Sequence, residues 1–197
     1  GACDVLVQAN GGDVSLAALL KTDTAGINSD SGKVSVMAPL GIASINTAAI
    51  VGGGAVIVEG QAINAAASRV ESTGSTVHIH ATDKDVKLAN TNVIKAYTDV
   101  TLEAQGEADL GAGSITGTSG KVTITATRGT AETTSAVVTA RKAVGISATD
   151  NDVLVGRVIS ESAGVTITCG PTKNGVARSL TNLGTISSGL SAINGLG

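Results

Sequence analysis

The sequence predicts an all-β fold, a right-handed parallel β-helix in which the chain winds into a triangular solenoid. Aliphatic residues recur about every 21–22 positions through nearly all of the 197 residues. Within each repeat the apolar residues alternate with polar ones, and such a period-two pattern at a fixed longer interval is typical of a β-solenoid. Aromatic residues make up only 1% of the chain, which suits a narrow interior filled by stacked aliphatic rows. Nine repeats predict about nine coils.

The clearest row contains one aliphatic residue per repeat, which we call the anchor. The anchors are Val14, Val34, Val56, Val77, Val100, Val122, Val144, Val165 and Ile186. The residues two positions after the first eight anchors are also aliphatic: Leu16, Val36, Val58, Ile79, Leu102, Ile124, Ile146 and Ile167. Two positions further on comes Ala or Gly, or in the eighth repeat Cys169. Because alternate side chains of a strand share one face, we predict that these rows fill the interior.

A second aliphatic row lies six or seven residues before the anchors. It contains Val7, Ile27, Ile50, Val70, Val93, Ile115, Val137, Val158 and Leu180. The corner between the two rows is rich in Gly, Asp, Asn and Ser, which tolerate tight turns. A third, weaker strand is predicted around Ile42, Ile63, 86–88 and 153–155. Three strands per coil predict the triangular cross-section, and the right-handed preference of parallel crossovers predicts the winding.

The continuous repeat predicts a single domain over residues 1–197, with residues 1–6 as an N-terminal extension and residues 7–169 as the regular coils. Residues 170–197 are predicted to form a last ragged coil, a cap or a segment that bridges two subunits. Their leucines and isoleucines are spaced by three and four, which also suits an amphipathic helix. Gly184, Gly189 and Gly195 disfavour that helix.

Composition excludes several classes of function. The net charge is only −3, and the 13 Lys and Arg residues are scattered without aromatic neighbours, so we expect no nucleic-acid partner. Apolar stretches are too short to span a bilayer. No charged segment followed by an apolar one opens the chain, so a secretion signal has been removed or was never present.

The chain offers little catalytic or metal-binding chemistry. Its carboxylates are scattered and no Gly-x-Ser-x-Gly motif occurs, so we expect no enzyme and no cofactor. His78 and His80 are predicted to point outward on one strand face, about 7 Å apart at the backbone, with Glu59 and Glu103 flanking His80 from neighbouring coils. This group is either a weak transition-metal site or, as we expect, a solvated strand face without metal.

Two other outward patterns have structural interpretations. Outward threonines such as Thr123 and Thr125 suggest an ice-binding face, but other residue types interrupt the array, so β-propensity and solubility explain it more simply. Asp13 with Lys33, and Asp99 with Lys121, are predicted to form ion pairs between coils, each contributing about 0.2–1 kcal/mol.

Residues 11–16 and 120–126, which read Gly-Gly-Asp-Val-Ser-Leu and Gly-Lys-Val-Thr-Ile-Thr-Ala, resemble the repeats of filamentous-haemagglutinin-type adhesins and autotransporter passengers. The resemblance covers roughly residues 10–169 and is one of repeat style. It implies an exported right-handed β-helix that acts as an adhesive or structural rod at the bacterial cell surface. It also implies that the chain is either a rod in its own right or a fragment of a larger adhesin.

Both ends of the predicted solenoid expose apolar strands. We therefore expect the protein to stack head to tail into an extracellular filament, with a host or neighbouring-cell surface as a further partner. The alternative is a solenoid that binds ice or a surface glycan. The predicted assembly residues are Val5, Val7, Leu180, Leu183, Ile186, Leu190 and Ile193.

The two cysteines lie in distant coils. Seven coil steps place Cys3 and Cys169 on the order of 34 Å apart, which excludes a disulfide within one chain unless a terminus folds back. Two alternatives remain: two thiols, or a bridge from Cys3 of one subunit to Cys169 of another.

Overall fold

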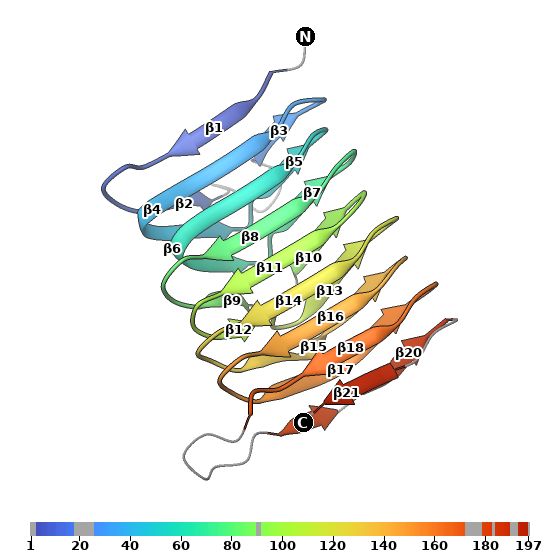
Figure 1. Cartoon of the computed structure of the whole chain (residues 1–197). Helices are drawn as coiled ribbons and strands as arrows, with labels where there is room; N and C mark the ends of the chain where they lie inside the picture. Colours follow the sequence, from blue (N-terminus) through green and yellow to red (C-terminus); the bar gives the residue numbers. More distant parts are fainter. Residues whose placement is uncertain are drawn as a thin grey trace.

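A computed structural model describes residues 3–17, 26–89, 92–171, 179–182, 184–189 and 193–196. These residues form 21 strands joined in a single sheet, and every strand pairing is parallel. The sheet winds around one apolar core as a β-solenoid, so the predicted fold class is confirmed. Figure 1 shows the coils stacked from the N-terminal end to the C-terminal end.

Three faces enclose the core, and we name each after one of its strands. The β8 face contains β1 (Val5–Gln8), the first part of β4 (Val34–Asn46), the first part of β6 (Val56–Ala66), β8 (Val77–Ala81), β11 (Val100–Ala104), β14 (Val122–Ala126), β16 (Val144–Ala148), β18 (Val165–Thr168) and β21 (Ile193–Leu196).

The β9 face contains β2 (Val14–Ala17), the second parts of β4 and β6, β9 (Val86–Ala89), β12 (Ala108–Asp109), the first parts of β15 (Ala131–Ala140) and β17 (Val153–Ser160), and β19 (Leu180–Asn182). The β10 face contains β3 (Gly26–Ser29), β5 (Ala49–Gly52), β7 (Arg69–Ser72), β10 (Asn92–Ala96), β13 (Gly113–Gly117), the second parts of β15 and β17, and β20 (Ile186–Ser188).

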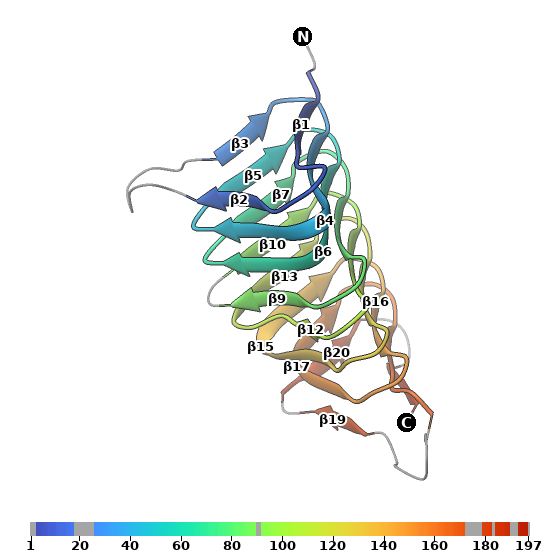
Figure 2. The same cartoon turned by 90° about the vertical axis from the view of Figure 1, so that its left-hand side faces the viewer.

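The winding is right-handed. Seen from outside, the strands of the β8 face run to the left as the chain descends in Figure 1, and those of the β9 face do the same in Figure 2. The solenoid has about six turns, so the predicted count of nine was too high.

The interior is built from the predicted aliphatic rows. In the described coils the residues two after the anchors, from Val36 to Ile167, are at most 1% exposed. Cys169 is buried at the end of its row, as its small-residue position predicts. At the corner between the β10 and β8 faces the turns stack closely. A Cβ at Gly53 would lie 2.1 Å from the carbonyl oxygen of Asp30, so a larger residue at this position would force these two turns apart.

The register of the first and last coils differs from the prediction. Val5, and not Val14, pairs with Val34, while Val14 pairs with Ala43 on the β9 face. At the other end Ile193, and not Ile186, pairs with Val165. The chain in each end coil is longer by about one strand than in the central coils, which shifts the predicted anchors Val14 and Ile186 onto neighbouring faces.

Some residues that we predicted to lie outside the regular coils form strands of the sheet. Val5 and Leu6, expected in an N-terminal extension, already form part of β1. The described part of residues 170–197 forms β19, β20 and β21, which pair with β17 and β18 of the same chain. It contains strands and not the amphipathic helix that its spacing also suited.

Two residues of the second row were placed on the wrong side. Val93 is exposed and Val137 is half-buried, whereas their neighbours Ile94 and Val138 face the core at 0% exposure. The register Val70↔Ile94↔Ile115↔Val138 confirms the inward row. Because both members of each pair are aliphatic, the period-two pattern did not distinguish them.

Aspartates connect successive coils through the backbone. Five Asp–Val steps each begin a strand, and in each the aspartate Oδ1 accepts a backbone N–H from the next coil at 2.7–2.8 Å. The pairs of aspartate and N–H donor are Asp4 and Lys33, Asp13 and Ile42, Asp85 and Glu107, Asp99 and Lys121, and Asp152 and Ser179. The predicted ion pairs of Asp13 with Lys33 and Asp99 with Lys121 were therefore wrong, since both carboxylates bond main-chain amides.

Asp85 illustrates the electrostatic effect of this contact. The backbone hydrogen bond from Glu107, helped by Lys87, lowers the pKa of Asp85 below its usual value although burial acts in the opposite direction.

Replacing Asp99 with Ala should lower the free energy of unfolding by about 1 kcal/mol, because the Lys121 N–H loses a charged acceptor. Asp99→Asn retains an acceptor oxygen and should lose less. Urea denaturation of both variants measures the difference, and an Ala variant as stable as the parent would contradict a bonding role for this carboxylate.

Candidate functional site

The N-terminal layer of the solenoid leaves the apolar interior partly open. Its inward-facing residues Val5, Val7, Leu16 and Ile27 are only half-buried. Their register partners one layer in are at most 1% exposed: Val34, Val36, Ile45 and Ile50. This end therefore presents the same apolar columns as the core, but without a covering layer among the described residues.

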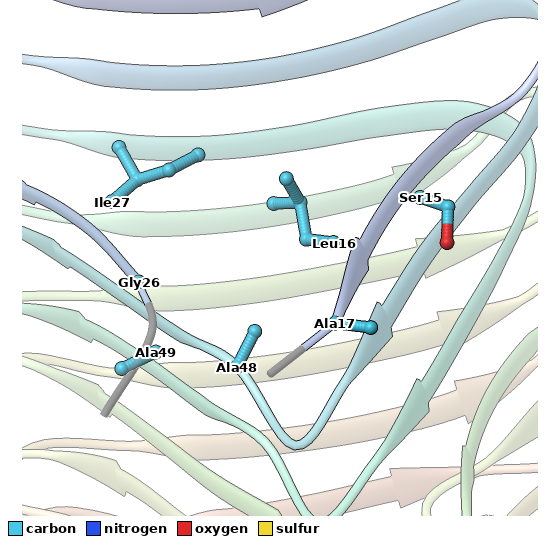
Figure 3. A pocket seen from close by; sticks show the side chains of 7 residues that line it. All are labelled: Ser15, Leu16, Ala17, Gly26, Ile27, Ala48 and Ala49. Carbon is cyan, nitrogen blue, oxygen red and sulfur yellow. The ribbon is translucent and has the colours of Figure 1, made fainter. Parts of the chain in front are cut away.

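A hollow of about 210 Å³ lies in this layer where β2 ends and β3 begins. Figure 3 shows the side chains of Leu16 and Ile27 in it, with Ala48 and Ala49 of the next coil nearby. A mainly aliphatic lining of this kind suits apolar side chains more than a polar ligand.

The C-terminal layer also leaves the apolar interior partly open. Leu180 and Ile186 are half-buried, whereas their register partners Val153 and Val158 are 0% exposed. Of the other predicted assembly residues at this end, Ile193 lies on β21, while Leu183 and Leu190 lie outside the described residues.

A second candidate site lies on the β8 face, where the structure brings the side chains of His78, His80 and Glu103 together. Glu59, His80 and Glu103 occupy one register column, as the sequence predicted. His78 Nε2 lies 3.2 Å from Glu103 Oε2, and the two histidine rings stack with centroids 5.7 Å apart. One ligand atom from each of His78, His80 and Glu103 lies within 4.8 Å of the others.

The threonine face is less regular than an ice-binding array requires. The column through His80 reads Met37, Glu59, His80, Glu103, Thr125, Ser147 and Thr168. Four side chains without a hydroxyl group precede the three hydroxyl side chains, so no flat, uniform hydroxyl surface spans this column.

A third candidate site is a group of charged side chains around a buried carboxylate on the β10 face. Glu71 points outward from β7 yet is only 5% exposed. Arg69 Nε donates to it at 2.7 Å, and Lys95 Nζ lies 3.3 Å away on the paired strand. Burial alone would raise the pKa of Glu71, but Arg69 and Lys95 outweigh it and hold this pKa below its usual value.

A hollow of about 210 Å³ lies beside Glu71 and includes Tyr97, the only aromatic residue of the chain. No pattern in the sequence indicated this group, because Arg69, Glu71 and Lys95 come together only through the register of β7 and β10.

Known proteins do not identify the chain. No protein-family model, no curated protein and no solved structure matches it. The structure confirms the parallel β-solenoid repeat, and no match supports a filamentous-haemagglutinin or autotransporter family.

Cys3 is exposed and Cys169 is buried, with no disulfide between them. Within the described part of the chain, no helix is long and apolar enough to cross a membrane.

Proposed function

We propose that the protein is a structural rod that associates head to tail, with the C-terminal layer of one copy covering the N-terminal layer of the next. The observation that carries this proposal is the partial exposure of the core columns at both ends of the described solenoid. Each such layer presents apolar side chains together with a row of strand N–H and C=O groups.

The two end surfaces match strand for strand. On the β8 face, β21 of one copy would lie against β1 of the next, while β19 would meet β2 on the β9 face and β20 would meet β3 on the β10 face. The parallel stacking inside the chain would then continue across the junction at the same spacing of about 4.8 Å. Because such a contact joins two different surfaces, it propagates into a filament and does not close as a dimer.

The cellular setting belongs to the same proposal. The resemblance to exported bacterial adhesins supports an extracellular rod at the bacterial cell surface, used for structure or adhesion and without enzymatic activity. A rod of stacked coils needs no catalytic group, and its lateral faces remain available to a host or neighbouring-cell surface.

Two charge substitutions test the stacking. Val7→Lys places a charge in the open N-terminal layer, and Ile186→Lys does the same in the C-terminal layer. Each should weaken self-association at least tenfold in sedimentation velocity, because an unpaired charge would be buried at the junction. Leu6→Lys, on the outward side of β1 and already 61% exposed, is the matched control and should assemble like the parent.

Mixing the two charged variants distinguishes a head-to-tail contact from a symmetric one. Each variant keeps one intact end, so an equimolar mixture should form a dimer with a single good junction and stop there. Filaments of the parent should be visible by electron microscopy. A parent that stays monomeric at high concentration, or a mixture that forms no dimer, would rule the proposal out.

A further inference from the structure

The ligand-type cluster on the β8 face has the composition and spacing of a transition-metal site. Metal–nitrogen and metal–oxygen bonds of about 2.0–2.2 Å place neighbouring ligand atoms of a tetrahedral site roughly 3.3 Å apart. His78 Nε2 and Glu103 Oε2 are already 3.2 Å apart. The remaining separations are at most 4.8 Å, so side-chain rotations that close about 1.5 Å would bring all three ligand atoms onto one ion.

Buried core residues hold the backbone of the strands that carry the cluster. His78 and His80 alternate with the core residues Val77 and Ile79 on β8, and Glu103 follows the core residue Leu102 on β11. These core side chains are at most 1% exposed, which fixes where the ligand side chains start. The ligand side chains are themselves half-exposed, so they can reorient and leave coordination positions open to water.

The surrounding charge favours a cation. Glu59 and Glu103 flank His80 on the two neighbouring strands. The outward positions of this face from the first part of β6 to β14 are Ile57, Glu59, His78, His80, Thr101, Glu103, Thr123 and Thr125, and none is Lys or Arg. Two carboxylates without a cationic side chain on this part of the face attract a positive ion.

We propose that His78, His80 and Glu103 bind a divalent transition-metal ion of the zinc, nickel or copper type. Two imidazoles favour these ions over Mg²⁺ and Ca²⁺, which prefer oxygen ligands alone. The ion would connect β8 to β11 and so join two successive coils. This site lies on a lateral face, and the proposal does not depend on head-to-tail stacking.

Zinc binding to the full-length, tag-free chain tests the site. Because the exposed Cys3 is another potential zinc ligand, the measurements use a Cys3→Ser background. Isothermal titration with ZnCl₂ should give one equivalent of bound ion, and MgCl₂ should give none at this site. Added ZnCl₂ should raise the Tm, and EDTA should reverse the rise.

Single substitutions then assign the ligands. His78→Ala, His80→Ala and Glu103→Gln should each reduce the zinc affinity at least tenfold and abolish the zinc-dependent rise in Tm. Glu132→Gln, which removes a carboxylate that bonds Thr134 on β15, is the matched control and should bind like the parent. In the Cu²⁺ form, electron paramagnetic resonance should show two nitrogen ligands in the parent and one in His80→Ala.

Metal-free melting curves show whether each variant is folded, so a lost site is distinguished from a lost fold. A parent that binds no zinc saturably, or ligand variants that bind as tightly as the control, would overturn the proposal.

Discussion

Replacing Ile124 with Asp should destabilise the protein by several kcal/mol, enough to remove most of the stability of an ordinary domain. Ile124 is 0% exposed and stacks between Leu102 and Ile146 in the central row of the core. A carboxylate there would have aliphatic neighbours above and below. Urea or thermal denaturation followed by circular dichroism measures the loss.

The neighbouring residue provides the control for this experiment. Thr123 lies on the same strand but points outward and is exposed, so Thr123→Asp should change the free energy of unfolding by no more than about 0.5 kcal/mol. Equal stability of Ile124→Asp and the parent would show that the inward row has been assigned to the wrong face. An equal loss of stability in both variants would show that the loss comes from disturbing the strand and not from burying a charge.

The central rows could be predicted because each coil repeats the same constraint. Where one aliphatic residue alternates with polar neighbours, as in Val122-Thr123-Ile124, only one choice of inward face is possible. Where two aliphatic residues are adjacent, as at Val93-Ile94, both choices bury an apolar side chain. Which of the two residues faces the core then depends on the register with the strands of the neighbouring coils, and a single repeat does not contain that information.

The ends were mispredicted for a related reason. The sequence contains two apolar alternations near its start, at 5–7 and at 14–16, and the second lies 20 residues before Val34, close to the repeat length. The structure instead pairs Val5 with Val34 across 29 residues, because β2 takes a place on the β9 face. A fixed repeat length does not reveal a coil that is longer than the others.

The candidate sites also contain some features that the sequence could predict and others that it could not. The placement of Glu59 and Glu103 beside His80 followed from strand alternation and the constant coil length, so it could be predicted. The aspartate contacts to backbone amides could have been found from the five Asp–Val steps, which all stand where a strand begins. The pairing of Glu71 with Lys95 depends on the exact register of the β10 face, which the sequence pattern had wrong at Val93.

Removing both cations around Glu71 should be the most damaging change to the surface of the solenoid. Arg69→Ala or Lys95→Ala alone leaves one partner and should cost about 1 kcal/mol or less. The double variant leaves a buried, unpaired carboxylate and should cost about 2–3 kcal/mol at neutral pH, because burial of an unpaired charge is the expensive state. The effect should therefore exceed the sum of the two single effects.

The pH dependence identifies the carboxylate as the cause. In the parent the pKa of Glu71 is lowered by Arg69 and Lys95, so its stabilising contribution is complete above the usual carboxylate pKa and is lost as the pH falls through the lowered value. In the double variant burial acts alone and favours the protonated form. The stability gap between parent and double variant should thus narrow as the pH is lowered, because protonation removes the unpaired charge.

Two further variants complete the test. Adding Glu71→Gln to the double variant should recover part of the lost stability at neutral pH and flatten its pH dependence. Arg141→Ala, which breaks an exposed pair with Glu161, should change stability by no more than about 0.5 kcal/mol. A stability gap that stays constant with pH would mean that Arg69 and Lys95 act through the packing of their aliphatic stems and not through the charge of Glu71.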